Sequence, residues 1–147
     1  MKDAFRLQEL DPRRLGKLFD QAFVENGFDE DGDLVVLEDF EVVVRVFVEQ
    51  DLLRYEASFG SGAPHLDVLS FVNAFNRETN MVKAYVRDDK DDDGDWVVTF
   101  EHDIKVYPKE SLSAATIVRA ARDFQGAVHH GIEAVDDGTV FPTNDED

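Results

Sequence analysis

The chain has 147 residues, a formal net charge of −18 and no cysteine. Its length is typical of one domain of about 100–150 residues, and its 43% hydrophobic residues are enough to build a buried core. The absence of cysteine excludes disulfide scaffolds, thiolate zinc sites, iron–sulfur clusters and cysteine nucleophiles.

Charge and hydropathy also indicate which classes of partner and which cellular compartment to expect. A strongly negative chain repels phosphate backbones and anionic lipids, so we expect neither nucleic acid nor a membrane as a partner. No apolar stretch approaches the roughly 20 residues that cross a bilayer. The first ten residues carry charges throughout and do not resemble a signal peptide. We therefore expect a soluble, cytoplasmic protein.

A helix is predicted to begin at Pro12. Asp11 can cap its first turn, and proline suits the first helical position because its missing N–H would have no partner there. Asn26 and Gly27 are predicted to end this helix. Apolar residues recur along it at three- and four-residue spacing: Leu15, Leu18, Phe19, Ala22 and Phe23. Basic residues also gather on it, at Arg13, Arg14 and Lys17, a pattern typical of a solvated helix face rather than of a nucleic-acid footprint.

The hydrophobic period changes to two after this helix. An apolar stretch at 34–37, followed by alternation over residues 40–48 and 52–59, predicts a three-stranded antiparallel meander. A glycine- and proline-containing break at 60–64 is followed by a second predicted helix that ends near residue 79. Strands are predicted over 82–86 and 96–104, and Ser111 begins the last helix.

The predicted element order is therefore α-β-β-β-α-β-β-α. Antiparallel strands with helices at both ends and one between predict a two-layer α+β fold. We divide the chain into an N-terminal extension (1–10), a single α+β domain (11–135) and an acidic tail (136–147). The tail is predicted to be disordered, because acids dominate its composition.

Two aspartate-rich segments are candidates for cation binding. Residues 89–94 match the D-x-D-x-D-G start of a calcium loop, in which Asp89, Asp91 and Asp93 would supply carboxylate ligands. Phe100 stands where such a loop needs a bidentate glutamate. Residues 29–33 match the same pattern over a shorter stretch and less completely. The alternative for both segments is a polar hairpin turn, because Asp and Gly tolerate the backbone angles of such turns.

Signals of catalysis are weak. The serines lack a G-x-S-x-G elbow, and the adjacent His129 and His130 point in different directions on a helix. A small hydrolase that uses His102 and a neighbouring carboxylate is the remaining enzymatic hypothesis. We therefore predict no catalytic residues, no cofactor and no enzymatic activity.

The segments 29–36 and 93–98, the meander between them and the helix end at 71–76 resemble the YbjN family, over roughly residues 12–135. That resemblance implies a fold similar to type III secretion chaperones, which are acidic, non-enzymatic proteins that often form homodimers and hold unfolded segments of partner proteins. It also implies a bacterial regulator of sensory transduction. The family supplies no catalytic residues to carry over.

The preferred hypothesis is a non-catalytic, chaperone-like interaction or regulatory module that forms a homodimer and binds a protein partner of unknown identity. Val43 and Phe47, on the mixed face of a predicted strand, and Val118, on the last helix, are the candidate interface residues. The alternative is a calcium-responsive protein that uses Asp89, Asp91 and Asp93, and the third hypothesis is the small hydrolase.

Overall fold

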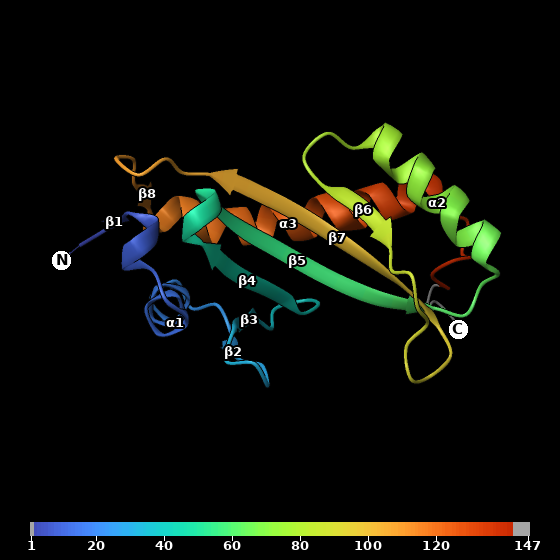
Figure 1. The fold of residues 1–147 in the computed structure, drawn as a ribbon, viewed down its shortest axis with the longest axis horizontal. Coiled ribbons are helices and arrows are strands. Elements are labelled where there is room, and N and C mark those ends of the chain that lie inside the picture. Colours follow the sequence, from blue (N-terminus) through green and yellow to red (C-terminus); the bar gives the residue numbers. More distant parts are fainter. Residues whose placement is uncertain (1, 143–147) are drawn as a thin grey trace. The chain divides into compact units, whose positions relative to one another are not determined.

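The computed structural model describes residues 2–142 of the chain and has an α+β fold (Figure 1). Six strands form one antiparallel sheet in the order β2-β3-β4-β5-β7-β6, and two short strands form the pair β1-β8. The elements are β1 (Ala4–Phe5), η1 (Leu7–Glu9), α1 (Pro12–Gln21), β2 (Asn26–Phe28), β3 (Leu34–Val36), β4 (Val42–Phe47), η2 (Val48–Gln50), β5 (Leu52–Ser61), α2 (His65–Glu78), β6 (Lys83–Val86), β7 (Trp96–Lys105), β8 (Leu112–Ser113) and α3 (Ala114–Val135).

The predicted α+β class, helices and meander are confirmed. Strands β3, β4 and β5 pair antiparallel, with Val35 opposite Val43 and Arg45 opposite Arg54. Sequence reasoning placed the end of α1 too late, because the helix ends at Gln21 and Asn26–Phe28 instead forms β2. It also missed β1 and β8, which are two residues long and carry no periodic signal.

The chain forms two compact units. The first comprises the chain up to Ala57 together with His102–Gln125, and the second comprises Ser58–Glu101 together with the chain from Gly126. No helix within residues 2–142 is long and apolar enough to span a membrane.

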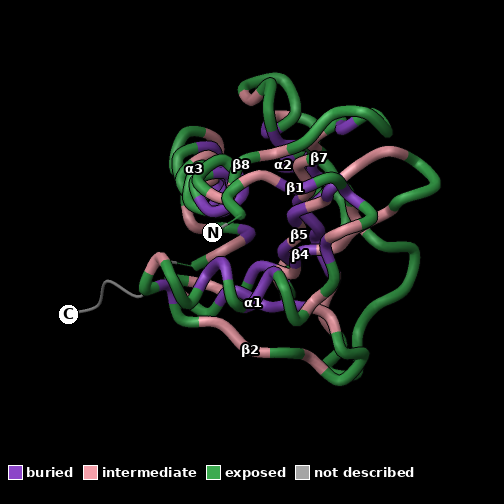
Figure 2. Tube along the Cα trace, turned by 90° about the vertical axis from the view of Figure 1, so that its left-hand side faces the viewer, coloured by how far each residue is buried: buried purple, intermediate pink, exposed green. Residues whose placement is uncertain are grey.

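In the first unit, α1 packs on β2 and β3. Buried and exposed residues alternate along α1 (Figure 2), and Leu15 and Phe19 lie on its buried side. The capping prediction is confirmed, because the Asp11 side chain accepts a hydrogen bond from the Arg14 N–H at 2.7 Å. Gly16 faces these strands, and a Cβ there would make ordinary van der Waals contact with the Leu34 side chain, at 3.6 Å.

Two polar contacts fasten α3 to the strands of the first unit. The buried Tyr55 hydroxyl donates to the Ile117 carbonyl at 2.6 Å, and burial raises the pKa of this phenol above its ordinary value. The Gln125 amide donates to the Glu38 carbonyl and, at 3.0 Å, to the Phe40 carbonyl. These bonds satisfy groups that burial would otherwise leave unpaired.

The second unit has an aromatic core. Phe75 and Phe100 meet with ring centroids 4.9 Å apart, and Phe71 meets Phe141 edge-on at 5.2 Å. Gly131 of α3 lies directly against Phe75 of α2, because a Cβ at Gly131 would be 2.4 Å from the ring. A larger residue at 131 would therefore require the Phe75 ring or one of the two helices to shift.

Both ends of the described chain are packed. Phe5 is buried and lies in β1, opposite Leu112 of β8. Val140 is also buried, and its carbonyl accepts a hydrogen bond from the Ser61 hydroxyl at 2.7 Å. Residues 136–142 thus differ from the disordered segment that composition predicts, and residues 143–147 of that predicted tail lie outside the described residues. The single domain over 11–135 stays a prediction.

Candidate functional site

The first acidic segment, 29–33, is a tight turn that joins β2 to β3. The Asp29 N–H donates to the Asp33 carbonyl, and the Gly32 N–H donates to the Asp29 carbonyl, both at 3.0 Å. Asp29 Oδ1 accepts two further backbone N–H groups, from Asp31 at 3.0 Å and from Asp33 at 2.9 Å. Gly32 has a φ of +84°, which a residue without a Cβ adopts readily.

The second acidic segment forms the same turn over residues 91–95, between β6 and β7. Asp91 Oδ1 accepts N–H groups from Asp93 at 3.0 Å and from Asp95 at 2.9 Å. The Gly94 N–H donates to the Asp91 carbonyl at 3.0 Å, and its φ is +80°. Both segments are therefore hairpin turns in which the first aspartate holds the backbone.

The two turns differ in how their carboxylates converge. One oxygen from each of Asp29, Asp31 and Asp33 lies within 4.8 Å of the others. Within residues 2–142, no such group of three contains Asp89, Asp91 and Asp93 together. The calcium site predicted at those three residues stays a prediction.

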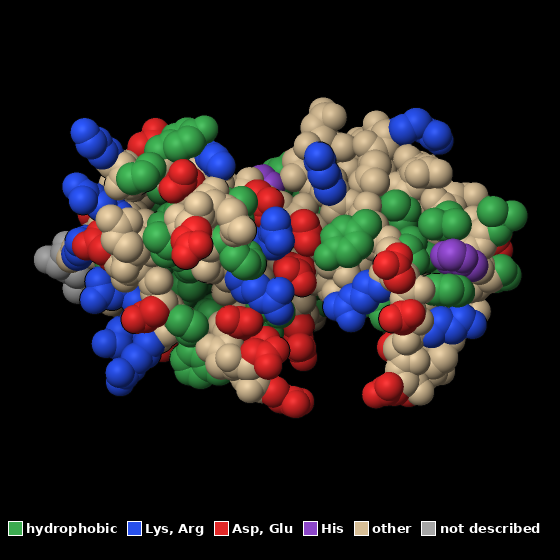
Figure 3. Space-filling view, viewed as in Figure 1, with side chains coloured by type: hydrophobic (Ala, Val, Ile, Leu, Met, Phe, Trp, Pro, Cys, Tyr) green, Lys and Arg blue, Asp and Glu red, His purple; other side chains and the backbone are tan. Residues whose placement is uncertain are grey.

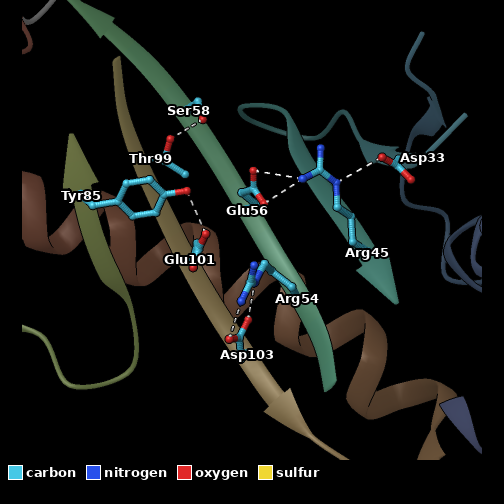
Figure 4. Close-up of polar contacts among 9 residues, drawn as sticks. All are labelled: Asp33, Arg45, Arg54, Glu56, Ser58, Tyr85, Thr99, Glu101 and Asp103. Carbon is cyan, nitrogen blue, oxygen red and sulfur yellow. Dashed lines mark hydrogen bonds and ion pairs between the residues drawn. The ribbon is translucent and has the colours of Figure 1, made fainter. Parts of the chain in front are cut away.

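The outward face of the sheet in the first unit is covered by ion pairs between strands (Figure 4). Arg45 of β4 lies between Asp33, at 3.1 Å, and Glu56, at 3.2 Å. Arg54 of β5 pairs with Asp103 of β7 at 2.8 Å. Each of these two arginines therefore has an acidic partner on the same face.

Two predicted interface residues, Val43 and Phe47, lie on β4 in this part of the sheet. Val43 is half-buried opposite Val35 on one side and Glu56 on the other. The half-buried Phe47 ring has the Arg54 guanidinium 5.1 Å from its centroid. Both side chains keep part of their apolar surface exposed among the ion pairs.

The third predicted interface residue, Val118, is buried, with 8% of its surface exposed, and lies at the bottom of an open groove between α1 and the first half of α3. This α1–α3 groove encloses about 550 Å³. Small apolar residues form much of its lining, and arginines lie among them: the full set is Leu18, Gln21, Ala22, Ala114, Ala115, Val118, Arg119, Arg122 and Asp123.

Basic side chains surround this groove. A neighbouring hollow of about 390 Å³ shares Leu18 and Gln21 with it and adds Lys2, Arg14 and Lys17. Figure 3 shows lysine and arginine side chains gathered over the end of the first unit that carries α1 and β1. The groove therefore combines an apolar floor with a positive rim, in a chain whose net charge is −18.

Phe23 follows the groove residue Ala22 and has an unusual conformation. Its φ is +60°, and its side chain is 93% exposed. The Val24 N–H bonds back to Phe19 and the Phe23 N–H to Asp20, a helix ending at which glycine is the usual residue. The sequence pattern placed Phe23 on the buried, apolar face of α1. Because the helix ends at Gln21, before it reaches Phe23, the ring is exposed instead.

The histidines do not form a catalytic group with the carboxylates considered. His102 and Asp103 are consecutive in β7, so their side chains point to opposite faces of the sheet. The His102 ring stacks on Tyr55 with centroids 6.3 Å apart, while Asp103 is engaged by Arg54. His65, at the start of α2, stacks on Trp96 at 3.9 Å.

Comparison with known proteins identifies the family. Residues 12–136 match the family model described as "YbjN: Putative bacterial sensory transduction regulator". A structure described as "Crystal structure of YbjN, a putative transcription regulator from E. coli" shares the fold, with a TM-score of 0.70 and 16% sequence identity over 90% of this chain and 97% of that one. No curated protein matches the sequence. Because the family model covers most of the chain, this protein belongs to the YbjN family.

Proposed function

We propose that this protein is a non-catalytic, chaperone-like regulatory module that holds a segment of a partner protein in the α1–α3 groove. The observation that carries the proposal is the groove itself, where the exposed Ala115 and the buried Val118 form an apolar lining beside Arg119. An open hydrophobic surface with a polar rim is typical of a docking site. The description of the family as a regulator agrees with this role.

We further propose that the protein acts in the cytoplasm as a homodimer. Val43 and Phe47 offer half-buried apolar surface for the contact between copies. Light scattering at micromolar concentration tests the dimer, which is expected to dissociate when Phe47 is replaced by aspartate. A monomeric wild type would contradict this part of the proposal and would leave the groove proposal standing.

Partner capture in the native cell tests the groove. Ala115 is exposed on α3, so Ala115→Trp would fill the groove without disturbing the core. Ala134→Trp places the same bulk on an exposed position of α3 outside the groove residues and serves as the control. Proteins cross-linked by the wild type and by Ala134→Trp, but lost with Ala115→Trp, would support the proposal. An identical set of cross-linked proteins for all three chains would contradict it.

A further inference from the structure

Three of the cations in or beside the α1–α3 groove lack acidic partners, whereas Arg122 pairs with Glu38 and Lys2 pairs with Glu9. Within residues 2–142, no carboxylate lies within the 4.0 Å of an ion pair from the side-chain nitrogens of Arg14, Lys17 or Arg119. By contrast, Arg45 and Arg54 on the sheet face are both paired. A chain with more than twice as many acids as bases could easily have paired its cations, so these three are available to a ligand.

From this contrast we infer the chemistry of the partner: the α1–α3 groove binds an acidic, amphipathic segment of another protein. Carboxylates on the segment would pair with Arg14, Lys17 and Arg119. Its apolar residues would cover Ala22 and Ala115, which are accessible parts of the groove floor. Such a segment matches both the charge and the hydropathy of the groove. This inference rests on the proposed function and specifies its partner.

A second copy of this chain does not fit the groove. A two-fold contact places the same surface on both sides, so the unpaired cations would face one another and repel. The most acidic segments of the chain are residues 29–33, 88–95 and 143–147, and none of them contains an apolar residue. They could meet the rim but would leave the apolar floor uncovered.

Phe23, just beyond the C-terminal end of α1, adds an independent observation next to the groove residue Ala22. A non-glycine residue in the left-handed region costs about 1–2 kcal/mol in backbone strain, and its exposed ring contributes little to the core. Exposed aromatic side chains next to grooves are frequent anchors in protein interfaces. We expect Phe23 to cover one end of the bound segment.

Fluorescence anisotropy with labelled peptides of about 18 residues, long enough to form a helix, tests the inference. The panel contains a peptide with leucines and glutamates on opposite helical faces, a scrambled version, a version with lysine in place of glutamate, and polyglutamate. A DNA duplex is the fifth probe. The amphipathic acidic peptide is expected to bind at least about tenfold more tightly than every other probe, and to weaken as salt is added.

Matched variants assign the binding to the groove. Replacing both Lys17 and Arg119 with glutamate is expected to weaken binding of the acidic peptide by about tenfold or more. Lys109→Glu reverses one exposed charge outside the groove and is expected to leave the affinity unchanged. Phe23→Gly is expected to weaken binding while raising thermal stability, whereas Leu66→Ala, at another exposed apolar position, is expected to leave binding unchanged.

The outcomes separate this inference from the proposed function. Equal binding of polyglutamate, preference for DNA, or no loss in the Lys17→Glu, Arg119→Glu variant would each overturn the acidic-segment inference. Failure of every peptide to bind the wild type would also overturn it. If the Ala115→Trp chain still loses cellular partners in that case, the groove remains a docking site for a segment of different chemistry.

Discussion

The turns at 29–33 and 91–95 share the sequence pattern D-x-D-G-D and the same hydrogen bonds, yet their surroundings differ. In each turn one aspartate accepts two backbone N–H groups, and one glycine has a positive φ. In the first turn Asp33 pairs with Arg45, whereas the Asp95 carboxylate lies beside Gly60. The D-x-D-G-D pattern therefore determines the backbone conformation of the turn, whereas the neighbouring residues determine which further contacts each carboxylate makes.

The largest effect is expected when the first aspartate of a turn is replaced. Asp29→Ala and Asp91→Ala each remove the acceptor of two backbone N–H groups, which we expect to lower the free energy of unfolding by about 1–2 kcal/mol. Urea unfolding measures this loss. Asp31→Ala and Asp93→Ala are the controls, because their carboxylates accept none of these bonds. If the control variants lose as much stability as Asp29→Ala, the first aspartate is not what holds the turn.

Replacing the glycines tests the backbone part of the comparison. Gly32→Ala and Gly94→Ala meet no atom within 4 Å, so strain at positive φ alone should lower the free energy of unfolding by about 1 kcal/mol in each case. Gly126→Ala is an informative control, because that glycine lies in α3 with equal open space. There alanine should raise stability, by up to about 1 kcal/mol, through its higher helix propensity. If alanine changes the free energy of unfolding in the same direction at all three positions, positive φ is not the cause of the effect.

The third aspartate should separate the two turns. Asp33→Asn weakens a partly exposed ion pair with Arg45 and is expected to cost about 0.5 kcal/mol, an effect that salt reduces. Asp95→Asn removes one charge from a segment crowded with aspartates and is expected to leave stability unchanged or slightly higher. Thermal unfolding at low and high salt measures both. Equal losses in the two variants would show that the pairing with Arg45 contributes nothing specific.

Calcium should give the smallest effect. The calcium hypothesis predicts heat on titration with about millimolar calcium, and this heat should be lost when Asp89, Asp91 and Asp93 are replaced by asparagine. The same replacements at Asp29, Asp31 and Asp33 are the control. Heat that disappears only with the control variant would move the cation site to the first turn, and no heat at all would end the hypothesis.

Local chemistry explains which features sequence could predict. The spacing of Leu15 and Phe19 predicted α1, and the alternation around Val43 predicted the meander. In both patterns the apolar residues recur at the period that places them on one buried face of the element. The end of α1 was missed because Phe23, an apolar residue, occupies the position at which glycine usually ends a helix. The α1–α3 groove joins residues about 100 positions apart, so no local pattern could reveal it.

The division of the chain into two units has a consequence for how the protein unfolds. Their boundaries fall at 57/58, 101/102 and 125/126, which are positions inside β5, β7 and α3 respectively. One unit cannot lose its secondary structure without breaking a continuous strand or helix of the other. We therefore expect both units to melt in a single cooperative transition, with equal calorimetric and van't Hoff enthalpies. For the same reason, no single proteolytic cut between elements would release either unit as an intact fragment.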